Sequence, residues 1–285
     1  MTKPFGILLS ESWKFFLSHL KSILIASAIF GVLMFGVQKI LEVQATNSVE
    51  DRFGDVGRIE ELAERIEAGD PDAFQEMMMQ MGMMGEEGEI DEAAIEAAAG
   101  DVISNMIPII AFVTFGIFIL TIIVSTFFTI LAVEGSTNFM TTLRRVPSLI
   151  LPMFGVWIWS FLRSFAWIPI IGVVLAIIIG PRLIMSSVIL IKEKTGVRES
   201  VKLSYNRSRG YWGKIVGNCI VAALVTMLAM LVLSMVIGMS AVVSGTLAAM
   251  LGALAQNLTM AYGTIFIVNL SNTILENPMQ TVSAK

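Results

Sequence analysis

Four long apolar runs dominate the chain, and short polar segments separate them. The runs cover residues 20–41, 102–133, 148–191 and 215–275. The fourth run contains no charged residue, and only Arg163 and Arg182 interrupt the third. A helix needs roughly 20 apolar residues to cross a bilayer core of about 30 Å. The first two runs therefore each predict one membrane span, and the third and fourth each predict two, the last pair turning at 239–246.

We expect these six spans to form an all-α membrane protein, a six-helix transmembrane bundle, because helices satisfy their own backbone hydrogen bonds in lipid. The composition agrees, since 55% of the 285 residues are hydrophobic and 15% are charged, against about 25% charged in an average protein. This composition excludes a disordered chain and a nucleic-acid binder. The single cysteine, Cys219, excludes an internal disulfide framework. We expect the first run to be an uncleaved anchor, because it is longer than the apolar part of a typical signal peptide.

Acidic and basic residues occupy different parts of the chain. Residues 42–101 hold 18 of the 23 acidic residues and three of the 19 basic residues. Bases otherwise flank the spans, and such bases collect on the cytoplasmic side of a membrane. The cytoplasmic segments are therefore predicted to be an interfacial helix at 1–19, a basic loop at 134–147, a basic elbow at 192–214 and a tail at 276–285. The acidic insert, 42–101, then lies outside the bacterial inner membrane, and both termini lie inside.

Three segments next to the spans mix aromatic and basic residues, a composition typical of helices that lie at the membrane interface. They are Phe5–Leu20, Asn138–Ser148 and Val197–Lys214. Either the chain contains three copies of one unit, an interfacial helix followed by two spans, or this order simply reflects basic inner loops. The residues predicted to contact lipid headgroups are Trp13, Lys14, Arg144, Arg145, Lys202, Arg207, Arg209, Trp212 and Lys214.

The acidic insert is predicted to form three short helices. Asp55 and Asp70 are candidate caps for the first two helices, and Asp91 would cap a third at Glu92–Ala99 that Gly100 ends. A methionine-rich run occupies 77–84. Soft thioethers select Cu(I), so one interpretation is a copper site, formed by Met77, Met78, Met81 and Met84. The favoured interpretation is that these adaptable side chains serve packing or a loose protein contact, with no metal or other cofactor.

A few polar residues fall within the spans. Arg182 follows Gly180-Pro181, so it is either part of an intramembrane site or an arginine that reaches lipid phosphates from a broken helix. Arg163 is expected at the outer turn between spans three and four. Asn218 and Asn269 either line a path or link helices by hydrogen bonds. Ser244, Ala248 and Gly252 form a small-residue stripe that favours close helix packing or contact with a partner protein.

One part of the sequence resembles a known group of bacterial membrane proteins. It runs IGPRLIMSSVILIKEKTGVRESVKLSYNRSRGYWGKIVG over 179–217, and the opening LSESWKFFLSHLKSILI over 9–25 adds to the resemblance. Both are similar to YciC-like membrane proteins and to the membrane domain associated with glycerophosphodiester phosphodiesterases. The chain has Gly-Pro where that group more often has Pro-Gly, and the acidic insert has no counterpart. The resemblance implies a six-helix bundle without the phosphodiesterase active site, which belongs to a separate domain.

The sequence contains no catalytic motif that we can identify, and we expect no enzyme activity. The leading hypothesis is an accessory or scaffold protein whose basic interfacial segments bind anionic lipids. It leaves open a protein partner at the acidic insert or at the small-residue stripe. Two alternatives are a transporter of a lipid or small solute that uses Arg182 and the broken fourth span, and an extracytoplasmic Cu(I)-binding protein.

Overall fold

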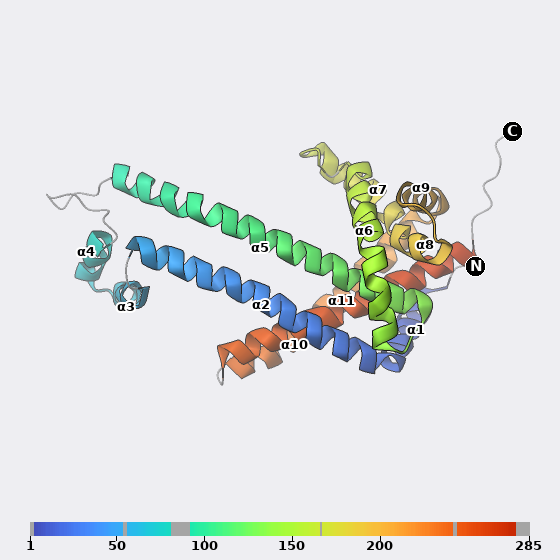
Figure 1. The fold of residues 1–285 in the computed structure, drawn as a ribbon, viewed down its shortest axis with the longest axis horizontal. Helices are drawn as coiled ribbons and strands as arrows, with labels where there is room; N and C mark the ends of the chain where they lie inside the picture. Colours follow the sequence, from blue (N-terminus) through green and yellow to red (C-terminus); the bar gives the residue numbers. More distant parts are fainter. Residues whose placement is uncertain (1–2, 54–55, 81–91, 166, 242–243, 278–285) are drawn as a thin grey trace. The chain divides into compact units, whose positions relative to one another are not determined.

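The computed structural model describes residues 3–53, 56–80, 92–165, 167–241 and 244–277, and the described residues form helices and no strands. The helices are α1 (Phe5–Ser18), α2 (Leu20–Phe53), α3 (Val56–Glu67), α4 (Pro71–Gln80), α5 (Glu92–Glu134), α6 (Phe139–Arg163), α7 (Ile171–Leu183), α8 (Ser186–Glu193), α9 (Val197–Arg207), α10 (Trp212–Ala241) and α11 (Gly245–Glu276). Figure 1 shows these helices along the chain. The all-α prediction is confirmed.

Six segments are long and apolar enough to cross a membrane, which confirms the six-helix bundle. They are Leu20–Gln44, Ile107–Glu134, Phe139–Arg163, Ile171–Glu193, Trp212–Met239 and Gly245–Glu276. The turn between the last two falls within the predicted range, since α10 ends at Ala241 and α11 begins at Gly245. Ser244 caps α11, its hydroxyl oxygen accepting a hydrogen bond from the Leu247 backbone N–H at 3.4 Å.

The chain divides into two compact units. The first, here called the bundle unit, is Met1–Leu33 with Ile119–Lys285, and the second, the insert unit, is Met34–Phe118. The boundaries fall inside α2 and α5 rather than between helices. The predicted span ends at Leu41, and α2 itself continues without interruption to Phe53. Its polar residues after position 41 are compatible with helix, so the helix does not end where the apolar run ends.

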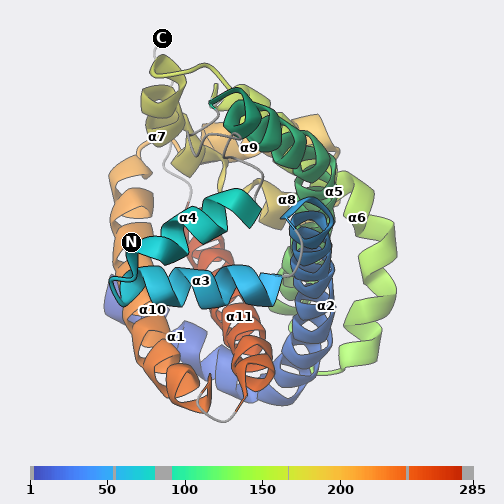
Figure 2. The same cartoon turned by 90° about the vertical axis from the view of Figure 1, so that its left-hand side faces the viewer.

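On the other side of the insert one prediction is wrong. The predicted separate helix Glu92–Ala99 is the first part of α5, which runs through Gly100 and Pro108. A single glycine costs a helix only about 1 kcal/mol relative to alanine, too little to end a helix that continues into a membrane span. The other two insert helices are confirmed as α3 and α4, which pack side by side (Figure 2).

The core of the bundle unit is built around α2, α5, α6 and α11. Phe127 and Phe128 of α5 are fully buried, and the Phe127 ring contacts those of Phe30 and Phe139 at centroid distances of 5.8 and 5.4 Å. At Gly31 the backbones come close, because an added Cβ would lie 3.4 Å from the backbone nitrogen of Leu254 in α11. This close approach is typical of small residues at helix interfaces in membranes.

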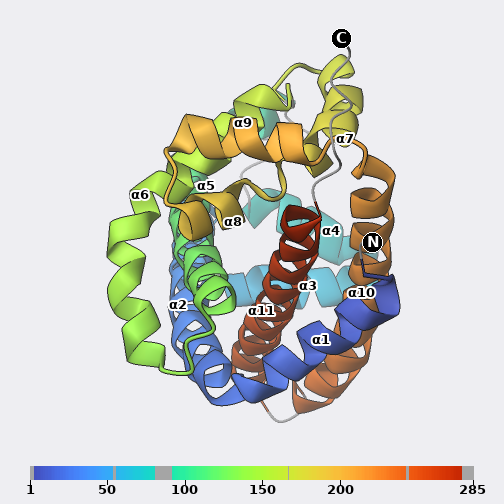
Figure 3. The same cartoon turned by 90° about the vertical axis from the view of Figure 1, so that its right-hand side faces the viewer.

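The interfacial helix predicted at the start of the chain is α1. It packs across α11, as Figure 3 shows. Phe16 is buried while Trp13, stacked on it at 5.7 Å, is half exposed. Ser12 joins the two helices by accepting a hydrogen bond from the Asn269 side-chain amide at 2.9 Å. The segment predicted at Asn138–Ser148 is instead the first part of α6, whose start is capped by Asn138; the cap and the apolar continuation make one helix of the loop and the span.

Candidate functional site

The predicted break in the fourth span is present. Pro181 lies in the last turn of α7, which ends at Leu183, and α8 begins at Ser186. Proline lacks an N–H and disturbs the preceding turn of a helix. The carbonyl oxygen of Arg182 accepts hydrogen bonds from the Ser204 and Ser208 hydroxyls at 2.7 and 3.2 Å. These two hydrogen bonds attach the C-terminal end of α7 to α9 and the residue that follows it.

Helix α9 also packs along α6. An added Cβ at Gly155 would lie 3.1 Å from the nearest methyl group of Val197, and the Arg198 guanidinium lies over the Trp159 ring at 4.7 Å. Further along α6, the Arg163 guanidinium lies over the Tyr205 ring at 4.9 Å. Figure 3 shows α9 beside α6 and α8. Three helices, α6, α7 and α9, thus meet at one place.

Two arginines converge on the phenol ring of Tyr205 at this place. The guanidinium carbon of Arg163 lies 4.9 Å from the ring centre and that of Arg182 lies 5.2 Å from it. The Arg182 Nη1 donates a hydrogen bond to the Tyr205 hydroxyl at 3.2 Å. We call these three residues the arginine–tyrosine cluster. A guanidinium over an aromatic face is attracted by the ring quadrupole, so Tyr205 positions both arginines.

No carboxylate balances the cluster within the part of the chain that the structure describes. The acids nearest in sequence are engaged elsewhere or exposed: Glu193 pairs with Arg207, and Glu199 is exposed on α9. The Arg182 Nε is buried and has no hydrogen-bond partner among the described residues. A buried donor without an acceptor costs free energy, so the cluster has unused capacity to bind an anion.

Arg163 lies beside a residue of α9. Arg163 was expected at an outer turn, whereas Tyr205 belongs to the basic elbow expected at the inner surface, yet the two side chains are in contact. The physical reason is that α9, anchored to α7 by Ser204, extends along the second half of α6. The C-terminal end of α6 therefore packs beside α9.

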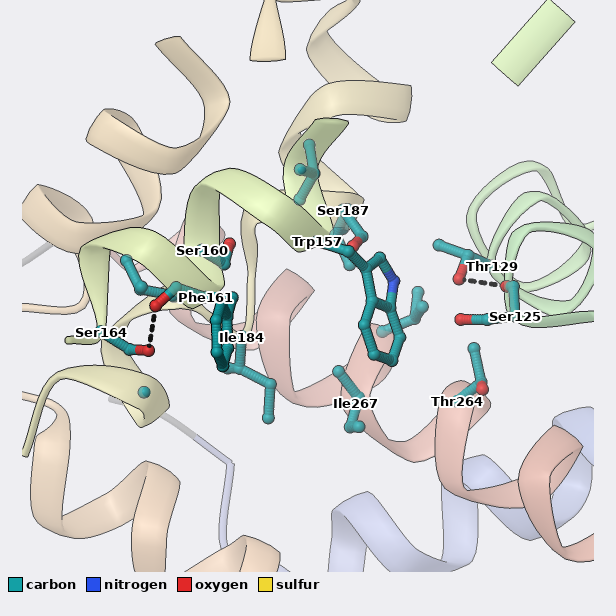
Figure 4. Close-up of a pocket in the computed structure, with 15 residues that line it drawn as sticks. Ser125, Thr129, Trp157, Ser160, Phe161, Ser164, Ile184, Ser187, Thr264 and Ile267 are labelled. Atoms are coloured by element: carbon teal, nitrogen blue, oxygen red, sulfur yellow. Dashed lines mark hydrogen bonds between the residues drawn. The ribbon is translucent and has the colours of Figure 1, made fainter. Parts of the chain in front are cut away.

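A cavity of about 380 Å³ lies between α5, α6, α7, α8 and α11. Figure 4 shows Trp157 in its centre, Ser125, Thr129 and Thr264 on one side, and Ser160 and Ser164 near Phe161 on the other. The hydroxyls of Thr129, Ser164 and Thr264 each donate to a backbone carbonyl three or four residues earlier in the chain. The buried Ser160 Oγ has no partner among the described residues. The cavity suits an apolar or weakly polar ligand.

The residues predicted to contact lipid fall into two groups. Trp13, Lys14, Arg144, Lys202 and Arg209 are exposed. Of the others, Arg145 pairs with Glu134 and Arg207 pairs with Glu193. Trp212 and Lys214 lie in the first turn of α10, after α9 has ended at Arg207. Both acids, Glu134 and Glu193, are the last residues of their helices.

The two asparagines proposed for an intramembrane path make different hydrogen bonds. Asn269 binds Ser12 and so links α11 to α1. Asn218 donates to the Lys214 carbonyl at 2.6 Å within its own helix. Neither belongs to the arginine–tyrosine cluster. The small-residue stripe is also not the point of close contact with α2, because an added Cβ at Gly252 would meet nothing within 4 Å, whereas Gly31 meets the backbone at Ala253 and Leu254.

The insert unit contains a separate group of charges on α3 and α4. Arg65 binds Asp70 and Glu76, and Arg58 binds Glu61 and Glu76. Hydrogen bonding to Arg65 lowers the pKa of Asp70, and hydrogen bonding to Arg58 and then Arg65 lowers the pKa of Glu76. These exposed pairs offset part of the repulsion among the acidic side chains of α3 and α4.

The methionine run is only partly described. Met78 is buried and Met77 half-buried in α4, beside buried residues of the helix pair, which agrees with the packing interpretation. Met81 and Met84 lie outside the described residues. Among the described residues there is no group of three or more His, Cys, Asp or Glu that could hold a metal ion.

Tyr205, the residue that both arginines contact, was not predicted from the sequence. One signal for it was present: Ser200, Ser204 and Ser208 recur every fourth residue and are all fully buried. This spacing marks one face of α9 as packed, and Tyr205 borders that face. Comparisons of this chain with protein-family models, with curated proteins and with solved structures found no match.

Proposed function

We propose that this multi-pass membrane protein is a non-catalytic accessory or scaffold protein of a bacterial inner membrane, with α1, α9 and the start of α6 binding anionic lipid headgroups on the cytoplasmic side. The observation that carries the proposal is the set of four exposed bases, Lys14, Arg144, Lys202 and Arg209. Among the residues that the structure describes, none of the four has an acidic partner. We also propose that the chain is related to the YciC-like proteins.

The energetic argument is simple. A base close to an anionic membrane surface adds about 1 kcal/mol of binding free energy. Removing the charges of Lys202 and Arg209 therefore weakens the preference of α9 for anionic lipid by about 2 kcal/mol, close to thirtyfold. A scaffold role adds a protein partner, for which the exposed acidic side chains of the insert unit are the proposed surface.

The test compares quenching of tryptophan fluorescence by brominated phosphatidylglycerol and brominated phosphatidylcholine in reconstituted protein. In a variant that keeps only Trp212, five residues beyond α9, phosphatidylglycerol should quench more strongly. The double variant Lys202→Gln/Arg209→Gln should lose most of this preference. The control Gln75→Glu/Asn47→Asp changes the net charge equally at exposed positions of the insert unit and should keep it. Equal quenching by both lipids in the parent protein would overturn the proposal.

A second candidate function is transport of a lipid or small solute, favoured by the cavity beside the broken fourth span. It predicts that the cavity opens to each side of the membrane in turn. Ser160→Cys in a Cys219→Ala background would then react with a small impermeant thiol reagent from both sides. Reaction from one side only, or from neither, would contradict transport through this cavity.

A further inference from the structure

The arginine–tyrosine cluster combines two positive charges with a buried donor, the Arg182 Nε, that has no acceptor among the described residues. Such a combination favours the binding of an anion. Two guanidinium groups near one ring repel each other, and in a region of low dielectric this repulsion is only weakly screened. Cation–π attraction to Tyr205 holds each arginine but supplies no negative charge. We propose that Arg163, Arg182 and Tyr205 form a specific binding site for one phosphate group.

Phosphate is the anion whose chemistry fits these groups. A guanidinium presents five N–H donors in a planar fork, and this fork matches the oxygens of phosphate in a bidentate arrangement. Arg182 uses Nη1 for the Tyr205 hydroxyl, while its buried Nε has no acceptor among the described residues. Arg163 brings a second fork to the same ring. A phosphate with several free oxygens can accept from both.

The site is held from three helices and so is organised in advance. Ser204 and Ser208 fix the backbone of Arg182 to α9. The contact between Val197 and Gly155 and that between Arg198 and Trp159 fix α9 to α6. An arginine held in place loses less conformational entropy on binding than a free one. This distinguishes the cluster from Lys202 and Arg209, which are exposed on or just after α9.

The surroundings indicate a lipid as the source of the phosphate. The last two turns of α6 expose Trp157, Phe161 and Leu162, while α9 carries charged residues along its outer side. Apolar and charged surfaces therefore meet at the cluster, as they do at the depth of lipid phosphates in a bilayer. A free phosphate offers the same chemistry, and the experiment separates the two sources.

Native mass spectrometry of the detergent-purified full chain provides the test. We expect one phosphatidylglycerol to remain bound, and diacylglycerol, which lacks the phosphate, not to bind. Arg163→Gln/Arg182→Gln should weaken phosphatidylglycerol binding at least tenfold. The control Gln75→Glu/Asn47→Asp, with the same change in net charge, should bind as the parent does. Unchanged binding by the folded Gln variant, or equal binding of diacylglycerol, would overturn the proposal.

A conservative variant covers the case in which the Gln variant does not fold. Arg163→Lys/Arg182→Lys keeps both charges but loses the planar forks, so it should bind several times more weakly while unfolding near the parent temperature. Unchanged binding by this variant would also overturn the site. Inorganic phosphate that displaces the lipid in an arginine-dependent way would indicate a free phosphate as ligand; no displacement would indicate the lipid. The bromide-quenching test uses different residues, so the two proposals can fail separately.

Discussion

The docking of α9 on α6 at Gly155 yields the most quantitative prediction. In a helix, Gly→Ala stabilises by about 0.5–1 kcal/mol through backbone entropy. Here the new Cβ would lie 3.1 and 3.3 Å from the two methyl groups of Val197. Overpacking of this kind costs about 1–3 kcal/mol. The cost exceeds the gain, so Gly155→Ala should leave the protein unchanged or up to about 2 kcal/mol less stable.

Removing the two methyl groups isolates the clash. In a Val197→Ala background the added Cβ meets only the Cβ of residue 197, at an ordinary contact distance of 3.8 Å, and Gly155→Ala should stabilise by its helix propensity alone. The double-mutant cycle should therefore give a coupling free energy of about 1–3 kcal/mol. Unfolding by sodium dodecyl sulfate in mixed micelles measures all four variants. A coupling below about 0.5 kcal/mol would refute the packing of α9 on α6, and with it the placement of Tyr205 beside Arg163.

Two further predictions concern other parts of the chain. The pKa values of Asp70 and Glu76 are lowered in the folded state, so their contribution to the α3–α4 pair is complete above their ordinary values of 3.8 and 4.5 and lost as the pH falls through the lowered values. Hydrogen exchange, corrected for its intrinsic rate, should show weaker protection of these helices at pH 3 than at pH 7; equal protection would contradict the ion-pair account. Gly31→Leu should destabilise by about 1–3 kcal/mol because its Cβ meets the Leu254 backbone, whereas Gly36→Leu, with nothing within 4 Å, should not; equal effects in thermal unfolding would refute the close contact.

The fold class could be predicted from the sequence because four long apolar runs dominate it. Long uncharged runs leave few alternatives to spanning helices, and proline at position 181 marks a break in the helix that the structure contains. Helix ends were harder to predict. The end of an apolar run such as 20–41 indicates where a membrane span ends. The helix itself can continue through polar residues in water, as α2 does to Phe53.

The candidate site was only half predictable. Arg182 stands out as a charge in an apolar run, but its companions come from segments distant in sequence. Tyr205 reaches Arg182 through the attachment of α9 to α7, a tertiary contact without a local pattern apart from the serine spacing. Arg163 was assigned to a turn by its position at the end of a run, and only packing shows which helix it faces.

The orientation of the chain in the membrane tests the central claim most directly, because anionic lipid binding by α9 requires that α9 face the cytoplasm. In a Cys219→Ala background, single cysteines at Gln75 of α4 and at Asn206 of α9, both exposed positions, would be treated with an impermeant maleimide in spheroplasts. We predict labelling of the cysteine at 75 in intact spheroplasts and of that at 206 only after lysis. Labelling of the cysteine at 206 before lysis would contradict the account.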